Sequence, residues 1–438
     1  MKNKWLVLLL VLALIKSLVW MLMTPIFQVP DENLHFGLIQ YLGENNRFPA
    51  PKTSRHVSLE LAKTAQAVNF NWMKSHPVWQ GLPLDWQQQI KSIDFQARKT
   101  FSDYQSMGGQ KLPKAYSIIG AIVYKNFSQA NFLWRFYALR FLSVVLGIIT
   151  VYLSYLIAEI FFKNKLLSFT VASLVAFQPM ASVIFSSITY DSLSILTATT
   201  FLYLAAKFIQ TTKKKFQWLA LIIALAGLIV KSQLIGLSLV WLFLLTKKQL
   251  KLLPLFLVII FILSWQDHDI RQFLLLIPEW LQGNNWHQIN NYFSVYTKPL
   301  LAEVFPWYWG VFGWLEKVMP LVIYRVIKII SGLALIGIIV SRQFRRIRVL
   351  LIFSLIMALV IMVNDFFIFS QSGANFGVQG RYFLPAIPAH MILLVFGLQA
   401  LISKNYHNLL AKTLIVSSLC LNLIALWTNY QYFGWLFF

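Results

Sequence analysis

Residues 5–24 read WLVLLLVLALIKSLVWMLMT, a run of twenty residues in which nearly every side chain is apolar. A helix needs about 20 predominantly apolar residues to cross roughly 30 Å of hydrocarbon. The run follows the basic residues Lys2 and Lys4, lacks a small-residue cleavage site and is long, so we expect a retained first membrane helix rather than a removed signal peptide.

Similar runs recur along the chain. Hydrophobic residues make up 58% of the 438 residues and charged residues only 12%, whereas soluble domains carry about 25% charged residues. Lipid cannot satisfy stray backbone groups, and the short alternating segments of a β-barrel are absent. We therefore expect an all-α polytopic membrane protein with about eleven transmembrane helices, at roughly 5–24, 132–161, 166–186, 191–210, 216–230, 233–246, 252–265, 319–340, 349–369, 382–402 and 410–428.

These runs divide the chain into a hydrophobic bundle and two polar segments. The first polar segment is weakly helical, and between residues 43 and 131 it carries eleven basic against five acidic residues. That excess suits an anionic lipid surface or a phosphate-bearing substrate, or it belongs to an ordinary solvated face. The expected regions are a first transmembrane helix (1–24), a mainly helical outer loop domain (25–131), a transmembrane bundle (132–265), a second outer loop with an aromatic box (266–318) and C-terminal transmembrane helices (319–438).

The distribution of charge sets the expected orientation. The net charge is +23, but it does not point to nucleic acid, because seventeen basic residues fall in the turns on one side of the predicted bundle. Glu159 is the only acidic residue on that side. Short loops with this bias lie in the cytoplasm. We expect a multi-pass protein of the cytoplasmic membrane, with its N-terminus inside and its C-terminus and active site outside.

Two of the expected spans, 216–230 and 233–246, are short for a full crossing, and Lys231 lies at their junction. The charge pattern requires a re-entrant hairpin or two short helices whose tip does not reach the outer water. Lys231 is then expected at membrane depth facing a cavity, where an unpaired charge is costly. The alternative is a lysine that reaches along its helix to the membrane surface.

The strongest local motif follows the first span and reads Gln28-Val29-Pro30-Asp31-Glu32-Asn33-Leu34-His35-Phe36-Gly37. Pro30 fits the start of a helix, and Asp31 fits its first turn, where the helix dipole favours a carboxylate. Asp31 and His35 are four residues apart and share one helix face, whereas Glu32 points elsewhere. Adjacent acids at a membrane edge indicate a task outside the membrane, although Asp31 could also serve only as a helix cap.

This Pro-Asp-Glu-x-x-His-Phe element resembles the polyprenyl-phosphate-sugar-dependent glycosyltransferases of the GT-C fold. These include protein O-mannosyltransferases, lipid A aminoarabinose transferases and a large bacterial family of uncharacterised relatives. The resemblance implies a GT-C-like fold, with Asp31 as the catalytic base and Glu32 as a supporting acid.

The likeness continues in the same order along the chain. One element reads Thr189-Tyr190-Asp191, where the family pattern has Asn-x-Asp, and this departure weakens the role that the resemblance implies for Asp191. The other similar fragments are Gln178-Pro179-Met180, Lys231-Ser232, the aromatic box Phe305-Pro306-Trp307-Tyr308-Trp309-Gly310 and Gln379-Gly380-Arg381-Tyr382-Phe383-Leu384-Pro385.

The chemistry of such a transfer fits the residues without the family. A lipid-phosphate leaving group departs as an anion, so the reaction needs a base for the acceptor hydroxyl and cations where charge develops. Asp31 can supply the base, and Arg381 and Lys231 the cations, because the arginine fork binds two phosphate oxygens. The alternative for Arg381 is an interface anchor beside Tyr382. The chemistry allows a divalent metal without requiring one.

We predict catalytic roles for Asp31 and Glu32, a lipid-phosphate-linked sugar donor, and a glycan, glycolipid or protein acceptor. Membrane lipids are the other expected partners, and no nucleic acid is expected. A transporter or flippase is the main alternative, and it predicts an internal repeat and charges across the whole membrane depth. A non-catalytic scaffold is the second alternative. The residues predicted to bind substrate are His35, Asp191, Lys231, Glu303, Trp307, Trp309, Gln379, Arg381 and Tyr382.

Overall fold

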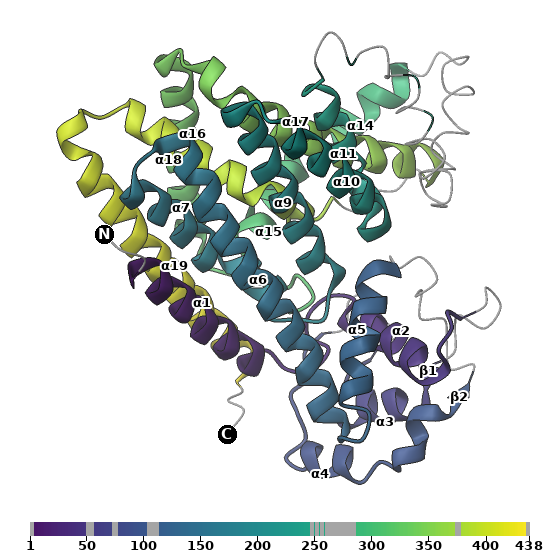
Figure 1. Cartoon of the computed structure of the whole chain (residues 1–438). Helices are drawn as coiled ribbons and strands as arrows, with labels where there is room; N and C mark the ends of the chain where they lie inside the picture. The colour runs from purple at the N-terminus through teal and green to yellow at the C-terminus, as the bar shows by residue number, and fades with distance from the viewer. Residues whose placement is uncertain are drawn as a thin grey trace.

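A computed structural model describes residues 4–49, 57–71, 78–102, 114–245, 286–372 and 378–434, together with residues 249, 254 and 258. Long helices form a bundle, and a smaller helical unit lies at one end of it (Figure 1). The all-α membrane fold expected from the sequence is confirmed. The bundle helices are α1 (Lys4–Met23), α6 (Phe132–Phe162), α7 (Lys165–Phe177), α8 (Pro179–Ile184), α9 (Tyr190–Thr211), α10 (Lys214–Val230), α11 (Ile235–Leu242), α16 (Leu321–Ser341), α17 (Phe344–Ser372), α18 (Ile387–Ala400) and α19 (His407–Phe433).

Seven helical segments in the described part of the chain are long and apolar enough to cross a membrane, so eleven spans are not confirmed. They correspond to seven of the predicted spans, whereas the predicted span 252–265 lies outside the described residues. The other predicted spans without a counterpart fall on short helices. These helices have too few residues to cross the hydrocarbon core. The seven segments are Lys4–Met23, Phe132–Phe162, Tyr190–Thr211, Leu321–Ser341, Phe344–Ser370, Gly380–Ala400 and Lys404–Phe433.

The predicted continuous span 166–186 is broken into α7 and α8. The residue before a proline is disfavoured in helical conformation, and Gln178, which precedes Pro179, is extended (φ −64°, ψ 124°). The Gln178 side chain accepts a hydrogen bond from the backbone N–H of Ala181, which caps α8. Its amide donates to the carbonyl of Tyr308, so the break also fixes the segment that carries the aromatic box.

The pair of short helices around Lys231 is present as α10 and α11. Lys231 is extended (φ −162°) and ends α10, and a turn of 3₁₀-helix, η3 (Ser232–Leu234), leads into α11. Gly227 allows the return, because a Cβ there would lie 3.2 Å from the Leu234 side chain. Lys231 is 5% exposed, so the charge at the tip of this hairpin is buried, as the sequence predicted.

The described residues between 25 and 131, which we call the first-loop unit, are mainly helical, as expected. Their core packs onto the N-terminal end of α6 through Phe27, Phe36, Phe132 and Phe136. Strand β1 (Val57–Ser58) pairs antiparallel with β2 (Phe101–Ser102), in the register Val57 to Ser102. The helices of this unit are α2 (Glu32–Asn45), α3 (Leu59–Ala67), α4 (Trp86–Lys91), η1 (Phe95–Lys99) and α5 (Lys114–Asn126).

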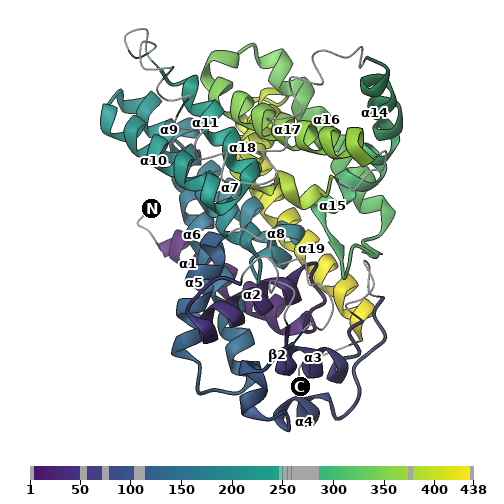
Figure 2. The ribbon, with the colours of Figure 1, turned by 90° about the vertical axis from the view of Figure 1, so that its right-hand side faces the viewer.

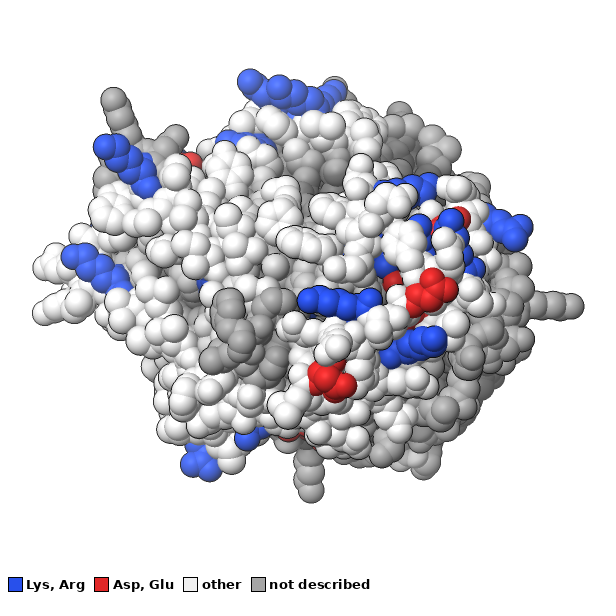
Figure 3. All heavy atoms as spheres, turned by 90° about the horizontal axis from the view of Figure 1, so that it is seen from below, with Lys and Arg blue, Asp and Glu red and all other residues white. Residues whose placement is uncertain are grey.

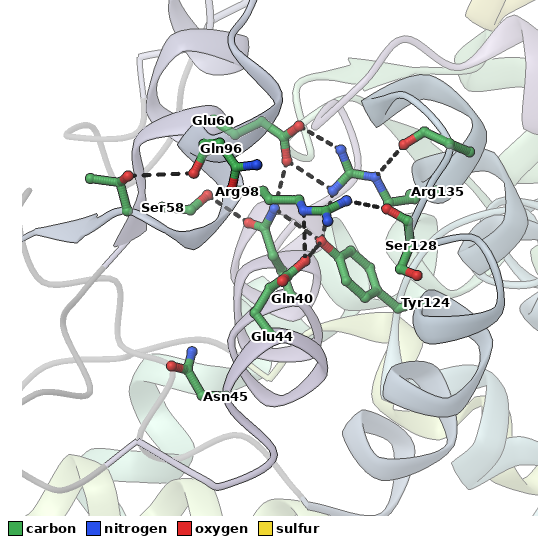
Figure 4. A network of polar contacts seen from close by, with 12 residues as sticks. Gln40, Glu44, Asn45, Ser58, Glu60, Gln96, Arg98, Tyr124, Ser128 and Arg135 are labelled. Carbon is green, nitrogen blue, oxygen red and sulfur yellow. Dashed lines mark hydrogen bonds and ion pairs between the residues drawn. The ribbon is translucent and has the colours of Figure 1, made fainter.

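A buried polar network joins the first-loop unit to the bundle (Figure 4). Arg135 of α6 is fully buried and binds both oxygens of Glu60 of α3, at 3.0 and 2.5 Å. Gln40 of α2 donates to Glu60 at 2.6 Å, and the Tyr124 hydroxyl of α5 accepts from Arg135 at 2.7 Å. Because each buried charge has a partner, the network holds four segments in one arrangement.

Helices α16 and α18 are neighbours in the bundle (Figure 2) and pack closely through glycines. A Cβ at Gly337 of α16 would lie 1.9 Å from the carbonyl oxygen of Gly397 of α18, and a Cβ at Gly397 would lie 2.0 Å from that of Ala334. Such backbone approach is how small residues join membrane helices. The contact places α18, and with it the preceding segment η6 (Gly380–Ala386).

Most of the remaining described elements lie within the second polar segment, 266–318. A Cβ at Gly380 of η6 would lie 2.1 Å from the Tyr308 nitrogen, so η6 packs directly on the aromatic box. These elements are α14 (Trp286–Pro299), the π-helical turn η5 (Leu300–Val304), α15 (Phe305–Trp309), β3 (Val311–Phe312) paired with β4 (Lys317–Val318), and η7 (Lys404–Tyr406) before α19.

Candidate active site

Four segments far apart in the sequence meet where the first-loop unit contacts the bundle. Each brings one charged side chain: Asp31 before α2, Asp191 in the first turn of α9, Lys231 after α10, and Arg381 in η6. We call these four residues the charge cluster. Asp31, Lys231 and Arg381, the residues predicted to supply the base and the cations, therefore lie in one cluster.

Arg381 lies between the two carboxylates of the charge cluster. Its Nη2 lies 2.7 Å from Oδ2 of Asp31, and its Nε lies 3.8 Å from Oδ2 of Asp191. Its Nη1 donates to the carbonyl of Pro30 at 3.3 Å. The guanidinium therefore binds both the backbone and the side chain of the Asp31 loop.

Lys231 is held by an ion pair and by two aromatic faces. Its ammonium lies 2.7 Å from Oδ1 of Asp191. It also lies 4.9 Å from the ring centre of Tyr190 and 4.4 Å from that of Tyr382, within cation–π range. The Lys231 ammonium is therefore not left unpaired, which would be costly for a buried charge.

Exposure distinguishes the members of the charge cluster. The side chain of Asp31 is 37% exposed, whereas those of Asp191, Lys231 and Arg381 are 5% to 6% exposed. With all four side chains ionised, their charges sum to zero. The arrangement therefore presents one accessible carboxylate, backed by two buried cations and a second, buried carboxylate.

The backbone of Asp31 is in the left-handed region, at φ 67°. Asp31 directly precedes α2, but its side chain makes no capping hydrogen bond. Non-glycine residues with positive φ are uncommon and are often maintained at functional sites. The helix-cap alternative therefore lacks the hydrogen bond that defines a side-chain cap.

Glu32 and Arg140 hold the segments that carry Asp31 and Asp191. Both side chains are fully buried and form a bidentate ion pair, with N–O distances of 2.8 and 2.7 Å. Glu32 also accepts from the backbone N–H groups of Phe27 and Ile188, at 3.2 and 3.0 Å. Arg140 donates to backbone carbonyls at the end of α1 and directly after it, namely those of Met21, Thr24 and Pro25.

This geometry separates the roles of the adjacent acids. Glu32 uses its oxygens on Arg140 and on two backbone groups, so it positions the loops instead of facing solvent. Arg140 is not among the residues predicted from the sequence. The sequence nevertheless contains a feature that points to Arg140, because an arginine within the apolar run 132–161 is a site candidate by default.

His35 lies beside the charge cluster. It is 2% exposed, and its ring packs edge-on against Tyr190, with centroids 4.8 Å apart. Burial lowers the pKa of His35 to about 4, an effect that nearby Asp31 and Asp191 oppose. The imidazole is therefore neutral at pH 7. Tyr190 was also not predicted as a site residue, although it directly precedes Asp191.

The aromatic box packs against η6 through the contact between Gly380 and Tyr308. Trp309 is buried and contacts the rings of Phe305 and Tyr308, whereas Trp307 is half-buried and Glu303 is exposed. In the described part of the chain, no ion pair or hydrogen bond joins Glu303, Trp307 or Trp309 to the charge cluster. These three predicted residues are thus separate from the four that converge.

An apolar cavity of about 420 Å³ lies between α15, α16 and α18. Phe383, which follows Tyr382 in η6, is part of its wall, whereas none of the four residues of the charge cluster lines it. The Tyr308 hydroxyl is 2.9 Å from Nδ1 of His390, another residue of the wall. Gln379 is half-buried, and its Oε1 has no hydrogen-bond partner within the described residues.

Among the described residues, no three His, Cys, Asp or Glu side chains lie close enough to hold a metal ion. The two carboxylates of the charge cluster are Asp31 and Asp191, and both are already paired with cations. On the surface seen from below Figure 1, basic side chains stand beside acidic ones, with much uncharged surface around them (Figure 3). The described residues on that face do not form a continuous basic surface.

Comparison with solved structures finds two similar chains of ArnT from Cupriavidus metallidurans. The crystal structure bound to undecaprenyl phosphate has 14% identity and a TM-score of 0.49, covering 99% of this chain and 76% of that chain. The structure in the apo state has 13% identity and a TM-score of 0.46, covering 98% and 76%. No curated protein matches the chain.

A family model described as "Predicted membrane protein (DUF2142)" matches residues 14–390. This stretch contains the whole charge cluster and the positioning pair Glu32 and Arg140. Because the match extends over most of the 438 residues, the chain belongs to the DUF2142 family of membrane proteins.

Proposed function

We propose that the chain is a GT-C-type glycosyltransferase that moves a sugar from a polyprenyl-phosphate donor to an acceptor hydroxyl, with inversion. The observation that carries the proposal is the convergence of Asp31, Lys231 and Arg381 from three distant segments, with Asp31 as the accessible carboxylate. The acceptor is a glycolipid, a cell-wall polymer or a protein. The positive-inside bias supports a site on the outer face of the cytoplasmic membrane.

In this reaction Asp31 takes the proton of the acceptor hydroxyl as its oxygen attacks the anomeric carbon. The bond between that carbon and the phosphate oxygen breaks, and the lipid phosphate leaves with the bonding electrons. Arg381 and Lys231 stabilise the negative charge that develops on the phosphate. A base and preorganised cations suffice, because a phosphate leaving group does not need to be protonated.

The resting contacts support an exchange of partners. Arg381 binds Asp31 at 2.7 Å. A donor phosphate adds negative charge to a cluster whose four charges sum to zero, and it competes with Asp31 for the guanidinium. Movement of Arg381 onto the phosphate leaves an oxygen of Asp31 available to accept the proton. Asp191 keeps Lys231 in place during this exchange, through their 2.7 Å contact.

The apolar cavity of about 420 Å³ supports a lipid-linked donor. It is lined mainly by apolar side chains, and its wall includes Phe383, the sequence neighbour of Tyr382, whose ring contacts the Lys231 ammonium. We propose that a donor with its phosphate at the charge cluster places part of its tail in this cavity, between α16 and α18. Apolar pockets with a few convergent polar groups are the usual form of ligand sites.

The test compares envelope glycans, by mass spectrometry, in cells that carry the gene, lack it, or carry Asp31→Asn. We expect one sugar substituent to disappear without the gene and to stay absent with Asp31→Asn. Asp85→Asn is the matched control, because Asp85 is an exposed acid of the same first-loop unit, paired only with Gln89 among the described residues. It should restore the substituent.

Restoration of the substituent by Asp31→Asn at normal expression would remove Asp31 from the mechanism. Unchanged glycans in all strains, with a lipid-linked precursor accumulating on one leaflet, would instead favour the flippase alternative.

A further inference from the structure

A second cavity, lined by basic side chains, lies at the end of the bundle remote from the charge cluster. It has a volume of about 520 Å³ and lies between the C-terminal ends of α6 and α9 and the N-terminal end of α17. Helix α9 connects the two sites, because Asp191 lies in its first turn and Ile209 of its last turn lines the cavity. Eighteen residues of helix span about 27 Å, close to the thickness of the hydrocarbon core. The cavity therefore lies at the opposite membrane surface.

Four basic side chains line this cavity, and no Asp or Glu in the described part of the chain does. They are Lys163 at the end of α6 and Arg345, Arg346 and Arg348 at the start of α17. Arg346 donates to the carbonyl of Phe161, so it joins the two helices. The described residues supply no ion-pair partner to Lys163, Arg345 or Arg348.

The position of these arginines is unfavourable without an anion. A helix N-terminus carries partial positive charge and attracts anions, so cations there are destabilising. Arg345 and Arg348 are three residues apart and face the same side of α17, where like charges repel. An anion bound between them would relieve both effects, and backbone N–H groups at a helix N-terminus are suited to phosphate.

Apart from Gln210, the other residues of the cavity wall are apolar. Ile160, Phe161, Ala206, Ile209 and Val349 line it beside the basic groups, and Ile209 is 46% exposed. A free anion makes no favourable contact with these apolar side chains. A phospholipid, by contrast, places its phosphate against the arginines and its glycerol and acyl carbons against the apolar side chains.

We propose that this cavity binds the phosphate headgroup of an anionic phospholipid on the side of the membrane opposite the charge cluster. The positive-inside bias alone requires basic residues in the turns but no cavity. The proposal is independent of the sugar-transfer function, because it concerns binding at a different membrane surface.

The test measures lipid retention by the full-length protein in native mass spectrometry. The probes are dioleoyl phosphatidylglycerol and dioleoyl phosphatidylcholine, which share their acyl chains and differ in net charge. The wild-type protein should retain phosphatidylglycerol in preference to phosphatidylcholine. In the double variant Arg345→Gln, Arg348→Gln, the affinity for phosphatidylglycerol should fall about 25-fold, because each basic residue near an anionic lipid contributes about fivefold to the affinity.

The matched control is the double variant Arg342→Gln, Lys412→Gln. Both residues are exposed and on the same predicted side, but neither lines the cavity, so the preference should be kept. Lys163→Gln provides a second variant that leaves α17 unaltered, and it should weaken retention about fivefold.

Three outcomes would overturn the proposal. One is an equal loss of retention in the control variant, which would show that only total charge matters. A second is equal retention of both lipids by the wild-type protein. The third is stabilisation by inorganic phosphate that depends on Arg345 and Arg348 while phosphatidylglycerol has no effect, because the ligand would then be a free anion.

Discussion

Arg381 contacts Asp31 in the resting site and is the proposed ligand of the donor phosphate. Its fork reaches both carboxylates of the charge cluster, at 2.7 and 3.8 Å. Lysine has a single point of charge and cannot reproduce that geometry. The proposal therefore depends on the shape of this side chain as well as on its charge.

Arg381→Lys should lower transfer from a polyprenyl-phosphate-sugar donor about a hundredfold, because one of two aligned hydrogen bonds is lost in the transition state. Most of the loss should appear in kcat/KM for the donor. The measurement is transfer by purified protein at increasing donor concentration. Arg98→Lys is the control, since Arg98 also binds an acid, Glu44, but lies in the network of the first-loop unit. Equal activity of Arg381→Lys and the wild-type protein would contradict the phosphate role.

His35 makes the stability of the site depend on pH. Burial lowers the pKa of His35 in the folded protein to about 4, whereas an unfolded histidine titrates near about 6.5. Between these values the unfolded chain binds more protons, so the stability from neutral His35 is complete above about pH 6.5 and is lost as the pH falls toward about 4.

The thermal midpoint in detergent should therefore fall between pH 7 and pH 5 more steeply for the wild-type protein than for His35→Gln. The full effect over the window is about 3 kcal/mol, since one pKa unit corresponds to about 1.36 kcal/mol. The check is a melting curve at both pH values for each protein. Parallel shifts of the two midpoints would show that His35 is not the group responsible.

At the scale of elements, the contact between α16 and α18 positions η6 and therefore Arg381. Gly337 and Gly397 bring the two backbones together so closely that a Cβ at Gly337 would lie 1.9 Å from a carbonyl oxygen. A backbone atom cannot move aside as a flexible side chain can. The helices must separate if any side chain is added there.

Gly337→Ala should lower stability by about 2 kcal/mol or more, since even one added carbon forces the backbones apart. Gly332→Ala is the matched control on the same helix, because a Cβ at Gly332 has no heavy atom within 4 Å. It should be neutral or stabilising, since alanine favours helix over glycine. Melting curves in detergent measure both variants, and an equal effect of the two would contradict the close contact.

At the scale of the whole molecule, the first-loop unit and the bundle act as one body through buried ion pairs. Glu60 binds Arg135, and Glu32 binds Arg140, which lies five residues further along the same helix. A buried pair gives little net stability, but removing one partner leaves an uncompensated charge. These pairs therefore specify how the unit docks on the bundle.

Glu60→Gln should destabilise the docking of the first-loop unit by about 3 kcal/mol, because Arg135 would remain buried without a carboxylate. Hydrogen exchange followed by mass spectrometry should show faster exchange in α2, α3 and α5, with α16 and α18 unchanged. Asp85→Asn removes a charge from the same unit at an exposed position and should leave exchange as in the wild-type protein. Uniform acceleration throughout the chain would argue against a local docking role.

Hydropathy and spacing determined much of the fold. The long apolar runs appear as helices because a lipid-facing segment has no other way to satisfy its backbone, and this requirement is local. The short helices were harder to assign. The break at Gln178 follows from Pro179, but the conformations of Gln178 and Lys231 are held by contacts with Tyr308 and Asp191, which lie far away in the sequence.

By itself, the sequence determined that this chain is helical and membrane-embedded, and it identified Asp31, Lys231 and Arg381 from their chemistry. Only the tertiary structure decided that Arg381 contacts Asp31, that Asp191 holds Lys231, and that Glu32 is buried against Arg140 while Asp31 stays accessible. The physical reason is that membrane insertion depends on the composition of each segment, whereas ion pairs depend on which distant segments are brought within a few ångströms by packing.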